Sequence, residues 1–230
     1  MAKVIIECCA NSVQSAINGQ AGGAERVELC ANLELGGTTP SAAAICMARE
    51  VLEIELFVLI RPRAGNFVYS EIEVEEILQD IEFCKEIGCE GVVLGALNQD
   101  GTVDYELTKE FVETAHPMKV TFHRAFDEAS DPNQALEAII ETGCERLLTS
   151  GQSERVEEGI SVLKGLLQKS NGRISIMAGG GLKPANALQL YTYGMREFHL
   201  SGINKKDTNQ PVLTDTNAIE EMVDIFEDLE

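Results

Sequence analysis

The sequence predicts a single domain of the α/β class, a (β/α)8 TIM barrel that spans residues 1–230. Eight short runs rich in β-forming residues alternate with amphipathic stretches, an order typical of a parallel sheet. The runs recur about every 30 residues, which is the length of one strand plus its crossover helix. No Ser/Gly-rich linker divides the chain. The predicted strands are Val4–Cys9, Arg26–Cys30, Leu56–Ile60, Gly91–Leu94, Val120–His123, Arg146–Thr149, Ile174–Ala178 and Glu197–Leu200.

Helix start and stop signals fall between these strands. Ser70 and Glu73 have the spacing of a capping box ahead of a helix over Ile72–Ile87, and Gly88 is placed to end that helix. An N-cap residue followed by a first-turn proline indicates another helix start. The remaining boundary signals are Pro40, Asp131-Pro132, Gly143, Pro184 and a last helix over Thr216–Leu229.

A weak internal repeat favours a closed barrel over a doubly wound sheet, which could also hold eight units. A helix stop followed by a strand recurs as Gly23–Leu29, Gly88–Leu94, Gly143–Thr149 and Gly194–Leu200. These copies precede every second strand, and alternate strands supply each layer of side chains inside a barrel. The repeat makes Glu28, Val93, Leu148 and His199 equivalent, and likewise Cys30, Gly95, Ser150 and Ser201 two residues later.

The amino-acid composition argues against some classes of binding partner. The formal net charge of −20 argues against nucleic acid and anionic membrane, which both reward clustered Lys and Arg. No apolar run approaches the roughly 20 residues of a membrane span, and the N-terminus lacks the features of a signal peptide. The seven cysteines are odd in number and include no C-x-x-C pair, which is typical of reduced thiols. We therefore expect a cytoplasmic protein that binds small molecules, metals or other proteins.

Ionisable residues end several strands, where TIM barrels place their active sites. The opposite strand ends look unremarkable by comparison. Arg61, Arg63 and Arg124 follow neighbouring odd strands, and arginine suits bidentate binding of carboxylate or phosphate. The glycines after the seventh strand and the serine after the eighth lie where barrels often bind phosphate. The predicted anion-binding residues are Arg61, Arg63, Arg124, Gly180, Gly181 and Ser201.

Acid–base groups accompany these arginines. Glu28 and His123 are the candidate catalytic residues, with Glu7 as a further ionisable group. The alternative is structural: Arg61 and Arg124 would pair with Glu7 and Glu28 and close the barrel with a buried ionic layer. The residues alone leave both interpretations open.

Two thiols provide a second kind of chemistry. Cys9 and Cys30 end adjacent strands, each two residues after a glutamate, so that these side chains face the same way. Adjacent strands lie about 4.8 Å apart, close enough for two thiolates to share one ion. Soft sulfur ligands favour Cu(I) or zinc. His199 or a methionine would have to assist, and Cys8 is expected to point the opposite way.

The residues at the strand ends resemble those of the CutC family, whose members are named as copper homeostasis proteins. The matching segments are Glu28–Cys30, Gly36–Ser41, Arg61–Arg63, Thr121–Asp127, Leu148–Gly151, Met177–Gly181 and Glu197–His199. The resemblance implies a TIM barrel, cytoplasmic copper handling with Cu(I) on Cys9 and Cys30, and association into homodimers or larger homo-oligomers. It implies no particular enzymatic reaction. The sequence departs from the usual pattern at Cys8, Ala64 and Asn66.

Three hypotheses follow. The first is a cytoplasmic copper homeostasis protein that binds Cu(I) through Cys9 and Cys30. The alternative is a TIM-barrel enzyme acting on a small phosphorylated or carboxylated metabolite, with Arg61 and Arg124 binding the anion and Glu28 or His123 moving a proton. The third is a regulatory or interaction barrel whose site is degenerate.

Overall fold

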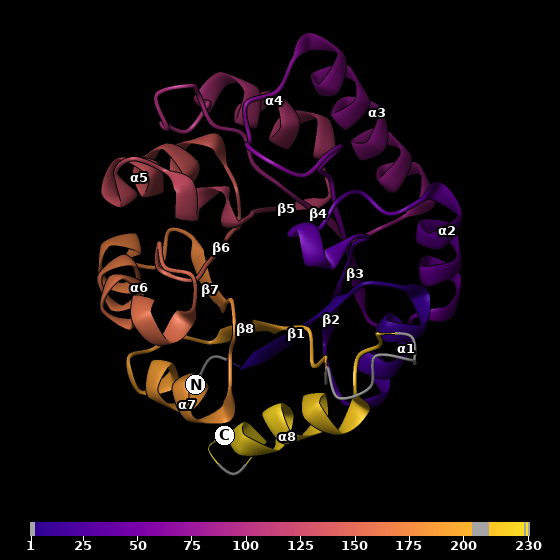
Figure 1. Ribbon diagram of the computed structural model, residues 1–230, viewed down its shortest axis with the longest axis vertical. Coiled ribbons are helices and arrows are strands. Elements are labelled where there is room, and N and C mark those ends of the chain that lie inside the picture. Colours follow the sequence, from indigo (N-terminus) through magenta and orange to yellow (C-terminus); the bar gives the residue numbers. More distant parts are fainter. Residues whose placement is uncertain (1–2, 204–211, 228, 230) are drawn as a thin grey trace.

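Eight parallel strands close into a barrel in the computed structural model, which describes residues 3–203, 212–227 and 229. The ring closes between the first and last strands, where Glu7 lies opposite His199 (Figure 1). The predicted TIM barrel is therefore confirmed. Its strands are β1 Ile5–Ala10, β2 Arg26–Leu29, β3 Glu55–Leu59, β4 Gly91–Leu94, β5 Lys119–Phe122, β6 Arg146–Thr149, β7 Ser175–Gly179 and β8 Glu197–Leu200.

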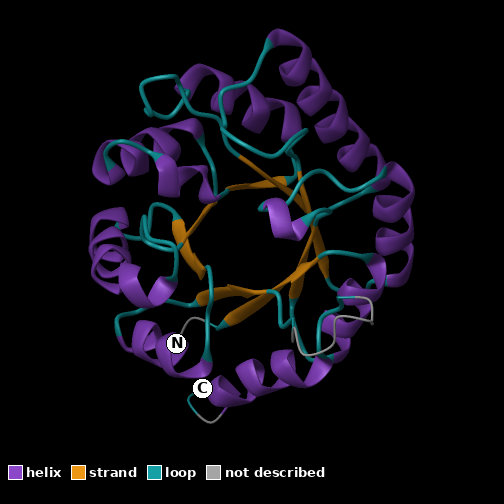
Figure 2. Cartoon of the chain, in the orientation of Figure 1, coloured by secondary structure: helices purple, strands orange, loops and turns teal. Residues whose placement is uncertain are grey.

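Helices surround this ring of strands on the outside (Figure 2). Each crossover carries the chain from the end of one strand to the start of the next parallel strand. Two short 3-10 turns, η1 Leu33–Leu35 and η2 Arg124–Glu128, follow β2 and β5 at the C-terminal end of the barrel. The helices are α1 Val13–Ala21, α2 Ala42–Val51, α3 Glu71–Ile87, α4 Tyr105–Ala115, α5 Pro132–Thr142, α6 Val156–Ser170, α7 Pro184–Thr192 and α8 Thr216–Glu227.

The helix boundaries confirm the capping signals in the sequence. Ser70 and Glu73 form a reciprocal capping box at the start of α3, and Gly88 ends that helix at φ 83°, a left-handed conformation that favours glycine. The Asp131 side chain accepts hydrogen bonds from the first turn of α5. Since each helix stops where a strand must begin, the local signals fix the length of each repeat.

Side chains of the strands alternate between the barrel interior and the helix layer. Cys8 points outward, as predicted: a Cβ on Gly19 of α1 would lie 2.6 Å from its Sγ, so glycine is needed for this close helix–strand contact. Its neighbour Cys9 points inward and packs in a small inner cluster. The members of that cluster are Cys9, Cys30, Phe57, Leu59 and Val93, with Leu33 of η1 packed against them.

The N-terminal end of the barrel interior contains a buried ionic network, which we call the floor network: Glu7, Arg26, Arg146 and Glu197. Arg26 donates to Glu7 and Glu197, and Arg146 donates to Glu197 and, at 3.0 Å, to Thr121 Oγ1. Both guanidinium groups lie over the Phe57 ring, at 5.1 and 5.2 Å. The expectation of unremarkable strand starts was therefore wrong, because alternation turns these first residues inward as well.

Two further features concern the cysteines and the character of the helices. All seven cysteines are free thiols, six of them buried and Cys46 exposed. Among the described residues, no helix has the length and apolar character that a membrane crossing demands.

Candidate functional site

Two thiols meet inside the barrel. Cys9 lies near the end of β1 and Cys30 directly follows β2, and their sulfur atoms are 4.0 Å apart. Both side chains are buried. The register of the parallel pair brings them together, because Cys9 pairs with Glu28 and the alternation places Cys30 on the same inner face. The two cysteines therefore lie side by side inside the barrel, as the sequence predicted.

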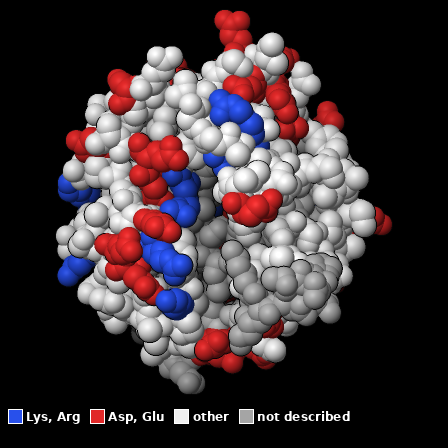
Figure 3. Space-filling view, in the orientation of Figure 1, with Lys and Arg blue, Asp and Glu red and all other residues white. Residues whose placement is uncertain are grey.

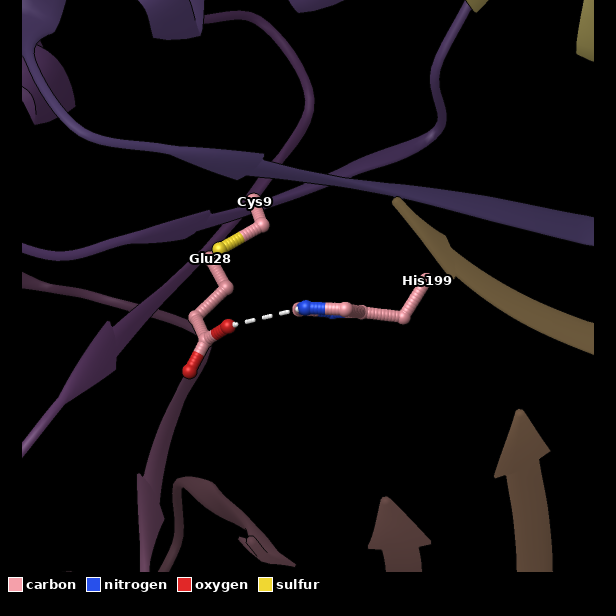
Figure 4. A group of neighbouring side chains, drawn as sticks. All are labelled: Cys9, Glu28 and His199. Atoms are coloured by element: carbon pink, nitrogen blue, oxygen red, sulfur yellow. Dashed lines mark ion pairs between the residues drawn. The ribbon is translucent and has the colours of Figure 1, made fainter. Parts of the chain in front are cut away.

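A carboxylate and an imidazole lie beside the thiols. One ligand atom each from Cys9, Glu28 and His199 lie within 4.8 Å of one another (Figure 4). The distance between Glu28 Oε2 and His199 Nε2 is 3.5 Å. Glu28 and His199 are each the third residue of their strand, the equivalence that the internal repeat predicts. We call Cys9, Glu28, Cys30 and His199 the thiol cluster.

Glu7 orients the imidazole of this cluster. His199 Nδ1 lies 2.7 Å from Glu7 Oε1, so the hydrogen bond leaves Nε2 facing Glu28 and the thiols. A carboxylate behind the distal nitrogen is the usual support of a metal-binding histidine. Burial alone would raise the pKa of Glu7, but Arg26 and His199 outweigh it and hold that pKa well below its usual range. Glu7 therefore belongs to both the floor network and the support of the thiol cluster.

Burial also affects the protonation of Glu28 and Cys9. It raises the pKa of Glu28 to about 7, against the opposing effect of His199. The hydrogen bond with Cys30, together with burial, raises the pKa of Cys9 well above its usual value. The Cys9 thiol is therefore protonated at neutral pH, and an entering metal ion would displace its proton. Two thiols, one imidazole and one carboxyl form a donor set that fits Cu(I) or zinc.

Arg61 is buried at the C-terminal opening, which we call the mouth, and it forms no ion pair with any carboxylate of the described residues. Its terminal nitrogens donate to the carbonyl oxygens of Gly37 at 3.0 Å and Gly65 at 2.7 Å. Its guanidinium carbon lies 4.6 Å from the centre of the Phe67 ring. Arg61 thereby joins the loop after β2 to the loop after β3. Its Nε atom is buried and has no hydrogen-bond partner among the described residues.

The other two arginines are engaged differently. Arg63 forms an ion pair with Glu73 of α3. Arg124 Nε lies 2.7 Å from Asp127 Oδ2, and its NH2 group donates to Ser150 Oγ at 2.8 Å. The sequence-based alternative paired Arg61 and Arg124 with Glu7 and Glu28. That pairing is wrong, because Arg26 and His199 occupy the inner carboxylates from the neighbouring strands.

The predicted phosphate-binding turn lies beside Arg124. A Cβ on Gly180 would lie 3.3 Å from the Arg124 guanidinium, and the Gly180 carbonyl accepts a hydrogen bond from Val156 N at 2.8 Å. Gly181, at φ 73°, lies against Arg155. Ser201 Oγ accepts a bond from Ile203 N at 3.4 Å. Gly181 is exposed, whereas Gly180 and Ser201 are half-buried. Figure 3 shows Lys and Arg side chains beside a central hollow of this face.

His123, the second candidate acid–base residue, lies apart from Glu28. It packs edge-on against Phe67 with ring centres 4.8 Å apart. Its Nδ1 accepts a hydrogen bond from Ala125 N at 3.3 Å, and its Nε2 is buried without a partner in the described chain. Burial and the charge of Arg61 lower the pKa of His123 to about 3. The imidazole is therefore neutral at physiological pH, with Nε2 protonated.

Sequence reasoning did not single out Phe67 or Tyr69. Phe67 is the common wall for Arg61 and His123, and the buried hydroxyl of Tyr69 is a further atom without a partner. Both residues belong to the loop between Arg61 and α3. The sequence did contain a signal for them, namely two aromatic residues in a loop that also carries polar residues. An aromatic side chain in such a loop needs a packing partner, which the mouth provides.

Comparisons with known proteins agree on one family. The model of the CutC family matches residues 4–204. A family protein CutC of Bacteroides fragilis is 48% identical over 203 residues, covering 87% of this chain and 81% of its own. The human copper homeostasis protein cutC homolog is 42% identical over 205 residues, covering 89% and 75%.

Solved structures show the same similarity. A crystal structure of a copper homeostasis protein CutC from Streptococcus agalactiae has a TM-score of 0.81 and 33% identity, covering 86% of this chain and 98% of its own. A thiamine phosphate pyrophosphorylase from Pyrococcus furiosus has a TM-score of 0.65 at 13% identity, covering 98% and 96%. The second likeness shows the fold alone.

Proposed function

The chain belongs to the CutC family, and from that premise we propose that it is a copper homeostasis protein that binds Cu(I) through Cys9 and Cys30. The observation that carries the proposal is the 4.0 Å separation of the two sulfur atoms inside the barrel. Metal–thiolate bonds are about 2.3 Å long, so one ion can contact both sulfurs without a large movement of the backbone.

His199 and Glu28 complete the proposed site. The imidazole Nε2 faces the thiols because Glu7 holds the opposite nitrogen. Soft thiolates and an imidazole suit Cu(I), whereas carboxylate contributes more to harder ions. Glu28 therefore acts in this proposal as a neighbour that accepts a released proton or contacts the ion weakly, and the two cysteines supply most of the affinity.

The proposed setting is a reducing one. The protein would act in the cytoplasm, where thiols stay reduced, and seven free cysteines are compatible with that location. The family resemblance further suggests a homodimer or larger homo-oligomer. Both statements extend the proposal and are separately testable by fractionation and by light scattering.

Anaerobic Cu(I) titration in competition with a coloured Cu(I) chelator tests the proposal. The exposed Cys46 thiol should first be removed by Cys46→Ser, because it would bind copper nonspecifically. In that background we expect one tightly bound Cu(I) per chain. Cys9→Ser combined with Cys30→Ser should lower the affinity by at least a hundredfold.

The chain offers a matched control. Cys84 and Cys89 are a second pair of buried, interacting thiols, and in the described chain they belong to no cluster of three metal-ligating residues. Cys84→Ser with Cys89→Ser should leave the titration unchanged. Loss of copper in this control, or its persistence in the Cys9 and Cys30 variant, contradicts the assignment. Zinc should be titrated in parallel, since tighter zinc than copper binding would also overturn it.

A further inference from the structure

Buried polar atoms without partners gather at one side of the mouth. In the described part of the chain, five buried side-chain nitrogen or oxygen atoms lack a hydrogen-bond partner. Three of them follow β3 or β5: Arg61 and His123 come soon after the strand ends, and Tyr69 lies in the loop between β3 and α3. The other two lie on α4 and α7. We call the three the mouth donors: Arg61 Nε, Tyr69 Oη and His123 Nε2. An unsatisfied buried polar group costs about 1–3 kcal/mol, so three together call for an explanation.

Each mouth donor has a hydrogen to donate, and the hydroxyl of Tyr69 can accept a hydrogen bond as well. The guanidinium of Arg61 has donors only. His123 accepts from Ala125 N at its Nδ1, so its proton is on Nε2. The phenol of Tyr69 stays protonated because burial raises its pKa to about 12. A set of donors without an acceptor is complementary to a ligand that brings several acceptor oxygens.

The same aromatic ring positions two of these donors. The Arg61 guanidinium carbon is 4.6 Å and the His123 ring centre 4.8 Å from the centre of Phe67. The carbonyls of Gly37 and Gly65 hold the other nitrogens of Arg61 and fix the direction of its Nε. Tyr69 interacts electrostatically with the same guanidinium and with that of Arg63, which lies over its ring at 5.7 Å. Arg61 and His123 are therefore held in fixed positions against one ring.

Charge points to an anion. Arg61 is 5% exposed, and no acidic side chain among the described residues lies within ion-pairing distance of it. A buried cation normally has an ionic partner, since desolvation costs several kcal/mol per ion. Arg26, Arg146 and Arg63 all have such partners. Although the protein is strongly acidic, Lys and Arg side chains lie beside the hollow of this face, together with Asp and Glu (Figure 3).

We infer that Arg61, Tyr69 and His123 form a binding site for the anionic oxygens of a small carboxylate or phosphate compound. Arg61 supplies the charge and one hydrogen bond, and the neutral imidazole and the phenol supply two more. The site lies next to the thiol cluster, because the Gly37 residue that anchors Arg61 would place a Cβ 3.7 Å from the Cβ of Cys30. It uses none of the four cluster side chains, so the inference stands apart from the copper proposal.

Anion binding by the metal-free protein tests the inference. The probes are inorganic phosphate and succinate, added at constant ionic strength with chloride as the reference. We expect a rise in Tm that saturates with either probe, and shifts of the Arg61 Nε–H and His123 Nε2–H signals in ¹H–¹⁵N spectra. Tyr69→Phe and His123→Phe should each weaken binding about tenfold or more, as expected for loss of a charge-assisted hydrogen bond.

A control variant locates the site. Arg124→Lys changes a neighbouring arginine that has an ionic partner, and it should leave the affinity unchanged. If Arg124→Lys abolishes binding while Tyr69→Phe and His123→Phe retain it, the anion binds at the Gly180 turn and the inference is wrong. Both probes should be tested up to about 50-fold above physiological metabolite levels, on the order of 50 mM. If Tm and the spectra stay unchanged, water alone satisfies the donors and the inference is wrong. The double variant Cys9→Ser with Cys30→Ser, which should lose Cu(I) binding, should bind both anion probes as the parent protein does.

Discussion

Arginines are buried at both ends of the barrel interior, but their surroundings differ. At the floor, Arg26 and Arg146 share the carboxylates of Glu7 and Glu197 and lie over one phenylalanine ring. At the mouth, Arg61 also lies over a phenylalanine ring. Within the described parts of the chain, however, its side-chain hydrogen bonds go only to backbone carbonyls and one nitrogen has no partner. The two ends thus use the same residue types, but the buried arginines at the floor have ionic partners and the buried arginine at the mouth does not.

This difference separates structural from binding roles. A buried charge that is fully paired stabilises one arrangement of the strands, whereas a buried donor that lacks an acceptor costs free energy unless a ligand supplies one. Glu7 connects the two ends, because it accepts from Arg26 below and holds His199 above. The floor therefore also determines how the thiol cluster is oriented.

Breaking the floor network should have the largest effect. Arg26→Met removes one ion and leaves Glu7 and Glu197 without that partner, which should lower the free energy of unfolding by about 3–5 kcal/mol. Urea denaturation measures this change. Arg173→Met, which removes a solvent-exposed partner of Glu137, is the control and should scarcely alter the midpoint. Equal effects of the two variants would contradict the structural role of the floor.

Acid should lower the free energy of unfolding through the protonation of His123. The pKa of this imidazole is lowered to about 3 by burial and by Arg61, whereas in the unfolded chain it is about 6.5. Between these values the unfolded chain takes up a proton that the folded protein refuses, so stability falls as the pH falls below about 6.5. Between pH 6.5 and pH 4 the loss should be on the order of 3 kcal/mol.

His123→Phe isolates this contribution. Unfolding midpoints of the parent and the variant, measured across the same pH range, should diverge steadily toward acid, with the variant less sensitive. Other titrating groups cancel in the difference between the two proteins. Parallel pH profiles would show that His123 is accessible to protons in the folded state, and would remove one mouth donor from the account.

Replacing the unpaired arginine should cost less than replacing the paired one. Arg61→Met loses hydrogen bonds to the carbonyls of Gly37 and Gly65 but also removes a buried charge without a counter-ion. We expect a loss of about 2 kcal/mol or less, against the larger loss for Arg26→Met. Urea denaturation of the two variants side by side measures the contrast. A loss for Arg61→Met as large as that for Arg26→Met would show that both ends are structural.

The smallest effect should come from the Tyr69 hydroxyl at the mouth, in contrast to the Thr121 hydroxyl at the floor. Tyr69→Phe removes a buried hydroxyl that has no partner among the described residues, so stability without ligand should stay within about 0.5 kcal/mol or increase. Thr121→Val removes the hydroxyl that accepts from Arg146 and should cost about 1–3 kcal/mol. Calorimetric unfolding in the absence of anions distinguishes the pair. A larger loss in Tyr69→Phe than in Thr121→Val would reverse the comparison.

The sequence was sufficient for the barrel because its signals are local. Ser70, Glu73 and Gly88 act within one helix, and the repeat of stop and strand places each following β-strand. Alternation likewise predicted that Cys9 and Cys30 would meet. The floor was missed because only the last residues of the strands received attention, although the pairs Arg26–Glu28 and Glu197–His199 alternate inward with the same period.

The partners of Arg61 could not be predicted from the sequence. They are backbone carbonyls of two loops, and the direction of a carbonyl depends on how each loop folds after the barrel has closed. The sequence suggested Glu7 and Glu28 instead, because charge alone pairs an arginine with any acidic residue. Ring closure gave those carboxylates closer partners on β2 and β8.

X-ray absorption at the copper edge is the most direct test of the central proposal, that Cys9 and Cys30 hold Cu(I) inside the barrel. The sample is the Cys46→Ser protein, loaded anaerobically with one Cu(I) per chain. We predict two sulfur neighbours at about 2.3 Å, the usual metal–thiolate distance, with a nitrogen neighbour from His199. In Cys9→Ser with Cys30→Ser, both sulfur neighbours should disappear. A copper ion surrounded only by nitrogen and oxygen, or sulfur neighbours that survive the double substitution, would contradict the proposal.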